Sequence, residues 1–202
     1  MFRKRAESLR EWKNQGDRKP LVIRGARQVG KTYLVREFAA AEFQYFIEIN
    51  FDETPSKREL FALEDIESVV QYLSLDADVP IIPGETLLFL DEIQQAPEIL
   101  ARLRYFYEKK PDLHVIAAGS LLDIVLADHT FSMPVGRIQY MHMGPLDFME
   151  FLRAIGATAL HGFIQTWTPD RPIPRTIHET LMEQVRLFMS VGGIPSAVRS
   201  YV

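Results

Sequence analysis

The residues of this sequence that could do chemistry begin with a loop bounded by two glycines, Gly25-Ala26-Arg27-Gln28-Val29-Gly30-Lys31-Thr32. The loop fits the pattern GxxxxGK[ST], in which the glycines let successive backbone N–H groups point at one anion. A lysine at this position brings a mobile positive charge to the β and γ phosphates, and a threonine hydroxyl can ligate Mg²⁺. The spacing therefore predicts a nucleotide-binding site over Gly25–Thr32, and we include the next residue, Tyr33, among its contacts.

A strand and a helix must position this loop. The apolar run Leu21-Val22-Ile23 before it predicts a strand, and the apolar spacing over 33–39 after it predicts a helix. A helix that opens at Lys31 directs the positive end of its dipole toward the bound anion. The alternative is a glycine turn with a surface lysine, which would not require a strand on one side and a helix on the other.

A second group of chemistry-bearing residues is the acidic pair Asp91-Glu92, which follows the apolar run Leu87–Leu90. Such a run is typical of a strand buried on both faces of a parallel sheet. Asp91 at the strand end is predicted to hold Mg²⁺, mainly through water, and Glu92 to polarise an attacking water as a general base. The alternative is a pair of solvated loop carboxylates.

The rest of the chain alternates strand and helix patterns up to Gly144 and is helical beyond it. This alternation predicts a parallel sheet with right-handed crossovers. Strands are expected over 21–23, 44–50, 86–90, 113–118 and 137–143, and helices over 2–12, 33–39, 55–75, 97–110 and 121–127, with a loop over 128–136.

Two sequence patterns beyond Gly144 predict capping boxes, Asp147 with Glu150 and Thr176 with Glu179. The second should begin a helix that Gly192-Gly193 ends, with another helix starting near Pro195. Its inward face is expected to hold Leu181, Val185, Phe188 and Met189. The unfinished apolar pattern at Val202 predicts that the natural protein continues.

Composition narrows the classes of function. The 202 residues carry a net charge of −4, which gives no electrostatic argument for broad binding of nucleic acid. Cysteine is absent, which excludes disulfides and thiolate metal sites, and no apolar run is long enough for a membrane helix. The five histidines have no metal-binding spacing and no serine lies in a GxSxG motif. We therefore expect a cytoplasmic protein without a resident transition metal.

The segments Gly25–Thr32, Leu87–Glu92 and Gly119-Ser120 resemble the AAA+ superfamily of P-loop ATPases. More specifically, the sequence resembles the bacterial and archaeal ATPases that join an AAA domain to a C-terminal domain of unknown function. Gly136-Arg137, the segment from Pro145 to Phe151 and the segment from Gly192 to Pro195 are similar to further signatures of that family.

This resemblance implies an α/β fold, the P-loop NTPase three-layer sandwich, with a five-stranded parallel sheet in the order 5-1-4-3-2 and an all-helical C-terminal part. It also implies ATP and Mg²⁺ as ligands. We expect an AAA+-like ATPase domain over residues 1–152. Residues 153–202 would form a helical lid or the start of a winged-helix domain, truncated at residue 202.

Three further residues acquire roles through the resemblance. Ser120 would lie between Lys31 and Glu92 as a sensor of the γ phosphate, or it caps the next helix. Asn50 would hold Glu92 out of position until a partner binds, or it forms a turn. Arg137 would complete the site of a neighbouring copy as an arginine finger in a homo-oligomer, or it makes a surface ion pair.

The leading interpretation of function is an Mg²⁺-dependent ATPase whose nucleotide state drives conformational change in attached domains or partners. A regulatory switch that binds ATP with little turnover needs the same loop and stays open. A P-loop kinase is disfavoured, since the 128–136 loop contains no arginine and the acidic pair favours water as the nucleophile. Nucleic acid stays possible through the arginines beyond residue 152, although net charge does not support it.

Overall fold

Five parallel strands form one sheet in a computed structural model that describes residues 2–120, 122 and 136–202. The strands are β1 (Leu21–Arg24), β2 (Tyr45–Asn50), β3 (Thr86–Asp91), β4 (His114–Gly119) and β5 (Gln139–His142). Their spatial order is β2-β3-β4-β1-β5, and every neighbouring pair is parallel. This order, read from the other edge, is 5-1-4-3-2, so the expected α/β fold and strand order are confirmed.

The chain folds into two compact units. The sheet unit comprises Arg5–Arg27 and Lys31–Met143. The helical unit comprises Met1–Lys4, Gln28–Gly30 and Gly144–Val202. Among the described residues, no helix is both long and apolar enough to cross a membrane. The domain boundary expected between residues 152 and 153 stays a prediction.

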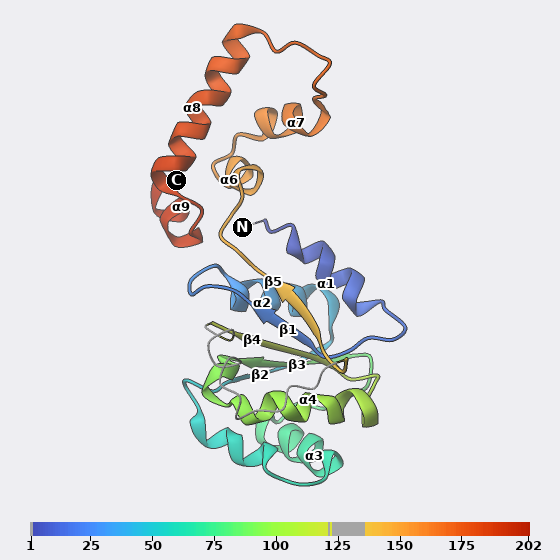
Figure 1. Cartoon of the computed structure of the whole chain (residues 1–202). Helices are drawn as coiled ribbons and strands as arrows, with labels where there is room; N and C mark the ends of the chain where they lie inside the picture. Colours follow the sequence, from blue (N-terminus) through green and yellow to red (C-terminus); the bar gives the residue numbers. More distant parts are fainter. Residues whose placement is uncertain (1, 121, 123–135) are drawn as a thin grey trace. The chain divides into compact units, whose positions relative to one another are not determined.

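Helices cover both faces of the sheet in the sheet unit (Figure 1). On one face lie α1 (Arg5–Lys13) and α2 (Lys31–Glu42), and on the other lie α3 (Ile66–Ala77) and α4 (Pro97–Lys109). Two short 3₁₀ turns follow strands, η1 (Pro55–Phe61) after β2 and η2 (Ile93–Gln95) after β3. A strand covered on both faces must be apolar at every position, which is why β3 and β4 contain unbroken apolar runs.

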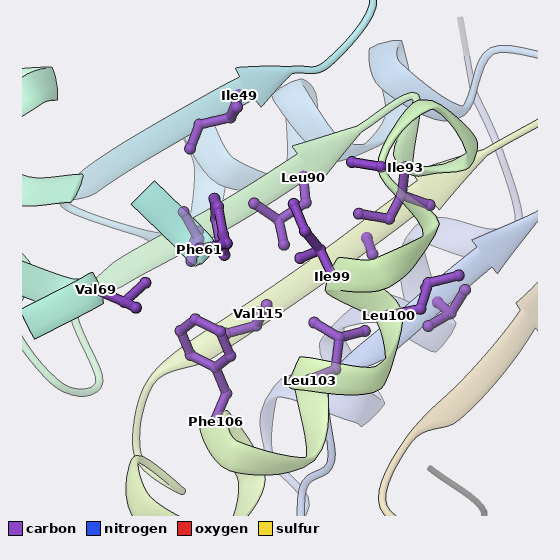
Figure 2. Packing of buried hydrophobic residues seen from close by; sticks show 14 of the residues in the cluster. Ile49, Phe61, Val69, Leu90, Ile93, Ile99, Leu100, Leu103, Phe106 and Val115 are labelled. Atoms are coloured by element: carbon purple, nitrogen blue, oxygen red, sulfur yellow. The ribbon is translucent and has the colours of Figure 1, made fainter. Parts of the chain in front are cut away.

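The main hydrophobic cluster fills the space between the sheet and the layer of α3 and α4 (Figure 2). Side chains alternate across a strand, so every second residue of β3 and β4 belongs to this cluster: Leu88, Leu90, Val115 and Ala117. Leu103 and Phe106 of α4 pack against them. This double-sided packing fixes the sheet register and therefore fixes where the strand ends lie.

The single helix expected over 55–75 is wrong, because the segment forms η1 and then α3. Asp65 interrupts it. The Asp65 carboxylate accepts a hydrogen bond from the backbone N–H of Ser68 at 2.9 Å, which caps a new helix there. The helix expected over 121–127 and the loop over 128–136 lie, apart from Leu122 and Gly136, outside the described residues.

The helical unit contains α6 (Phe148–Ala154), α7 (Thr158–Thr166), α8 (Arg175–Val191) and α9 (Pro195–Tyr201). Leu146, Phe151 and Val198 form its buried cluster. The expected capping box is confirmed at α6, where the Asp147 carboxylate accepts from the N–H of Glu150 at 2.8 Å and the Glu150 carboxylate accepts from the N–H of Asp147 at 3.1 Å.

Two expectations for α8 are wrong. The helix begins at Arg175 after Pro174, so Thr176 lies inside the first turn and caps nothing. Glu179 instead accepts a hydrogen bond from Arg175 Nε at 2.7 Å. Met189 is not inward but 79% exposed, since Phe188 takes the inward position by packing on the rings of helix α6 and the next residue turns away from it.

Candidate functional site

The glycine-bounded loop leaves β1 and ends where α2 begins at Lys31. Gln28 and Gly30 have positive φ angles of 65° and 92°, a conformation that turns the backbone sharply and that favours glycine. Ala26, Arg27 and Gln28 have exposed side chains. A loop of this kind presents main-chain groups rather than side chains at its inner side, as an anion site requires.

Lys31 is 7% exposed, and its Nζ donates hydrogen bonds to the backbone carbonyls of Gly25 and Ala26, both at 2.9 Å. Burial lowers the pKa of Lys31, and the negative charges of Glu92 and Asp91 oppose that shift. The ammonium therefore lies within the loop, bound to carbonyl dipoles. Phosphate oxygens carry full negative charge and are stronger acceptors than these carbonyls.

Thr32 and Asp91 lie together although 59 positions separate them. The Thr32 hydroxyl donates to Asp91 Oδ2 at 2.7 Å, and the backbone N–H of Glu92 donates to Asp91 Oδ1 at 3.0 Å. Asp91 is 2% exposed, and its burial raises the pKa of the carboxyl while these two hydrogen bonds lower it. The pair fits Mg²⁺, since a hydroxyl and a carboxylate are hard oxygen ligands.

Glu92 and Ser120 also meet, at the ends of the neighbouring strands β3 and β4. The buried Ser120 hydroxyl donates to Glu92 Oε2 at 3.5 Å. Glu92 has a φ of 51°, an uncommon left-handed conformation for a residue with a side chain. The contact agrees with the position expected for Ser120, whose role as a sensor stays a prediction. The helix that Ser120 would cap lies outside the described residues.

Sequence reasoning missed Gln94, which the structure adds to this group. Its side-chain Nε2 donates to the same Glu92 Oε2. The only signal in the sequence is its place two residues after the acidic pair, in the turn before Pro97. That signal is weak, because side chains in a turn can point in many directions.

Asn50 lies opposite Asp91 in the register of β2 and β3, but its side-chain amide makes hydrogen bonds within the turn that follows β2. Its Oδ1 accepts from the N–H groups of Asp52 and Glu53, at 3.0 and 3.4 Å, and its Nδ2 donates to Glu53 Oε1 at 3.2 Å. These hydrogen bonds favour the interpretation that Asn50 forms a turn over the interpretation that it keeps Glu92 out of position.

Arg137 lies just before β5, where its Nε pairs with Glu108 Oε1 at 3.1 Å and its guanidinium lies 5.6 Å from the Tyr107 ring. Half of the Arg137 side chain is exposed, so this ion pair is worth about 1 kcal/mol at most. Tyr33 is 40% exposed on α2. The structure thus brings Lys31, Thr32 and the acidic pair into one group and leaves Arg137 outside that group.

Within the helical unit, Arg3 connects the glycine-bounded loop to the segment that leads into α6. Arg3 is 6% exposed and donates to the backbone carbonyls of Val29 at 3.3 Å and Gly144 at 2.6 Å. Its Nε lies 3.4 Å from Glu150 Oε1. Sequence reasoning missed this connection as well, since 26 and 141 positions separate Arg3 from the two carbonyls.

A family model described as an AAA domain matches residues 17–152, about two thirds of the chain. None of the curated proteins matches.

Solved structures share the fold, each at a TM-score of 0.50. PCH-2 of C. elegans is 14% identical, over 96% of this chain and 58% of that one. The Aeropyrum pernix ORC2 protein, solved as ADPNP and ADP complexes, is 17% identical, over 78% of this chain and 52% of that one. The structure of Drosophila ORC bound to DNA is 16% identical, over 79% of this chain and 48% of that one. The chain therefore spans about half the length of these structures.

Proposed function

The chain belongs to the AAA domain family, and we propose that it binds ATP together with Mg²⁺ and hydrolyses the γ phosphate. Family membership and the shared AAA+ fold support nucleotide binding. The observation that carries the finer proposal is the 2.7 Å contact between Thr32 and Asp91, beside Glu92 and Lys31. A magnesium pair, a phosphate-binding lysine and a base at one sheet edge are what the proposed reaction requires.

Each residue has a defined part in the proposed reaction. The backbone of Gly25–Gly30 and the Lys31 ammonium would hold the β and γ phosphates, with Lys31 leaving the two carbonyls that it now binds. Thr32 and Asp91 would hold Mg²⁺ directly or through water, and the ion would neutralise charge on the phosphates.

Glu92 is the proposed general base. Water attacks the γ phosphorus, its proton passes to the Glu92 carboxylate, and the bond from the γ phosphorus to the β–γ bridging oxygen breaks to give ADP and phosphate. Because no covalent intermediate forms, rate depends on how the water and the phosphates are positioned. Ser120, within reach of Glu92 Oε2, is a candidate to sense the γ phosphate.

Two variants separate ATP binding from ATP hydrolysis and would test this proposal. Lys31→Ala is expected to remove ATP binding in titration calorimetry, whereas Glu92→Gln keeps binding and stops phosphate release. Lys109→Ala and Glu98→Gln, which change exposed side chains of α4, are the matched controls and should behave as the wild type. Equal turnover by Glu92→Gln and the wild type would refute the assignment of the base.

A regulatory switch with little turnover is the second candidate. It is favoured by one observation: the donors on Glu92 Oε2, which occupy the proposed base. Single-turnover kinetics separate the two candidates, because a switch releases phosphate far more slowly than an ATPase at the same nucleotide occupancy. Phosphate release without any added acceptor would exclude the kinase alternative.

Coupling of nucleotide state to other parts of the protein is also proposed. Arg3 donates to Val29 in the glycine-bounded loop and pairs with Glu150 of α6, so a change in the loop would reach the helices. A homo-oligomer in which Arg137 acts in trans stays a proposal. Turnover per site that rises with protein concentration, and does not rise in Arg137→Ala, would support it. Localisation in the cytoplasm stays a prediction, and net charge gives no argument for nucleic acid.

A further inference from the structure

Gln94 contacts the proposed base directly. It lies in η2, two residues after Glu92, and its Nε2 donates to Glu92 Oε2. The Ser120 hydroxyl donates to the same oxygen at 3.5 Å. One carboxylate oxygen of Glu92 therefore accepts two hydrogen bonds from neighbouring side chains, which leaves less of its lone-pair density for a water.

The orientation of the Gln94 amide follows from chemistry. The reverse orientation would place the amide oxygen against a carboxylate oxygen, and two acceptors repel. In the orientation that donates to Glu92, the amide Oε1 is buried and has no hydrogen-bond partner among residues 2–120, 122 and 136–202. A buried acceptor without a donor costs free energy. The Gln94 amide thus makes a hydrogen bond to Glu92 through Nε2, while its Oε1 makes none among the described residues.

Gly119, at the end of β4, leaves room for this amide. A Cβ built on Gly119 would lie 2.5 Å from Gln94 Oε1, closer than real Cβ atoms approach an oxygen, and 2.9 Å from Leu122 Cγ. Any larger residue at this position would move the amide of Gln94. The glycine that ends β4 therefore permits the contact between Gln94 and Glu92.

The neighbouring glutamine shows that the contact is specific to one position. Gln95 Nε2 donates to Asp52 Oδ1 at 3.1 Å, beyond the end of β2 and away from the base. Asn50, the residue expected from sequence to hold Glu92, binds its own turn instead. Among the described residues, Gln94 and Ser120 both donate to Glu92 Oε2, and of the two glutamines after the base only Gln94 reaches it.

We propose that Gln94 is a positioning residue that holds Glu92 in a resting orientation, so that hydrolysis requires the Gln94 amide to leave Glu92 Oε2. This role of Gln94 rests on the proposed function of Glu92 as the base. Two donors on one oxygen fix the direction of the whole Glu92 carboxylate, so it cannot turn toward an attacking water. When the amide leaves, Oε2 keeps one long contact, from Ser120 at 3.5 Å, so the carboxylate can turn to accept the proton and Gln94 Oε1 can meet a donor.

The test compares Gln94→Ala with Gln95→Ala in the full chain. Gln94→Ala is expected to raise kcat for phosphate release about tenfold while KM for ATP stays unchanged, since hydrogen bonds to charged groups shift equilibria by about this factor. Gln95→Ala should leave both constants as in the wild type. A merely structural role for Gln94 would lower turnover or raise KM. An unchanged or lower kcat in Gln94→Ala overturns the proposal.

Two further variants keep the outcome clear. Gly119→Ala displaces the amide by its Cβ and should raise kcat in the same direction. The double variant Glu92→Gln/Gln94→Ala should lose the gain entirely. If the wild type hydrolyses ATP and Gln94→Ala matches it, only the role of Gln94 fails. If every variant binds ATP and none releases phosphate, the ATPase proposal fails together with it.

Discussion

The two units of this chain are stabilised in different ways. In the sheet unit, β3 and β4 are buried at every position, and one large apolar cluster joins the sheet to α3 and α4. In the helical unit, none of the residues of α7 and α8, both fully described, is buried. The buried apolar cluster of the helical unit is small, and a buried ion pair lies beside it in sequence, at Arg3 and Glu150. The sheet unit can therefore hold Lys31, Thr32 and Asp91 in fixed positions, and the helices of the other unit can change their arrangement at lower cost.

The largest expected effect is on the ion pair between Arg3 and Glu150. Both side chains are 6% exposed, so Arg3→Met would leave a buried carboxylate without its charge partner and is expected to cost about 3–5 kcal/mol in the free energy of unfolding. The adjacent Lys4 pairs with Asp147 at the surface, and Lys4→Met should cost about 1 kcal/mol at most. Urea titrations of the two variants give both values. Equal losses would show that burial of the first pair does not matter.

The next largest difference is expected when apolar side chains are shortened, because the loss in the free energy of unfolding should be larger in the sheet unit than in the helical unit. Leu88→Ala in β3 removes a fully buried side chain from the main cluster and should cost about 2–5 kcal/mol. Leu181→Ala in α8, where the side chain is only half-buried, should cost about 1 kcal/mol. Chemical denaturation measures the difference. A larger loss in α8 would contradict the contrast between a packed sheet and thinly covered helices.

A smaller effect is expected from acid. His114 at the start of β4 is 4% exposed, and burial lowers its pKa to about 4. Because the unfolded chain binds this proton near pH 6.5 and the folded chain does not, stability falls as the pH is lowered between these values. From about pH 7 to about pH 5 the loss is about 2 kcal/mol.

The His114→Phe variant should lose this share of the pH dependence, and His142→Phe, which changes an exposed residue of β5, should keep it. Unfolding titrations at the two pH values measure both slopes. An identical slope in wild type and His114→Phe would show that another group controls stability in acid.

The smallest expected effect concerns Arg175 and Glu179 on α8, whose side chains are 91% and 57% exposed. Breaking this pair with Glu179→Gln should cost about 0.5 kcal/mol or less and should vanish at high salt. Thermal unfolding at low and high salt measures it. A large, salt-independent loss would mean that α8 packs more tightly than its exposure indicates.

The contrast between the units also explains what sequence could predict. Continuous apolar runs predict buried strands, and the glycine-bounded loop and the acidic pair each predict part of a nucleotide site, because each of these patterns is formed by residues close together in the chain. The strand order came from resemblance to the AAA+ superfamily, and the structure confirms it.

The contacts of Arg3 and Gln94 were not predictable in this way. The first joins residues 141 positions apart, and the second depends on the direction of one side chain in a tight turn. The break at Asp65 and the outward Met189 show a related limit. A capping hydrogen bond determines where α3 begins, and the rotation of α8 determines on which face Met189 lies. The spacing of apolar residues predicts neither feature to within one residue.

Whether the end of β3 holds magnesium for ATP hydrolysis is tested by phosphate release from ATP as magnesium is titrated, for the wild type and for Asp91→Asn. The wild type is expected to release phosphate only with magnesium present. Asp91→Asn, which keeps the shape of the side chain but loses the charge beside Thr32, should need at least about tenfold more magnesium to reach half its maximal rate. Identical magnesium curves for the two proteins would contradict the assignment of this strand end as the catalytic site.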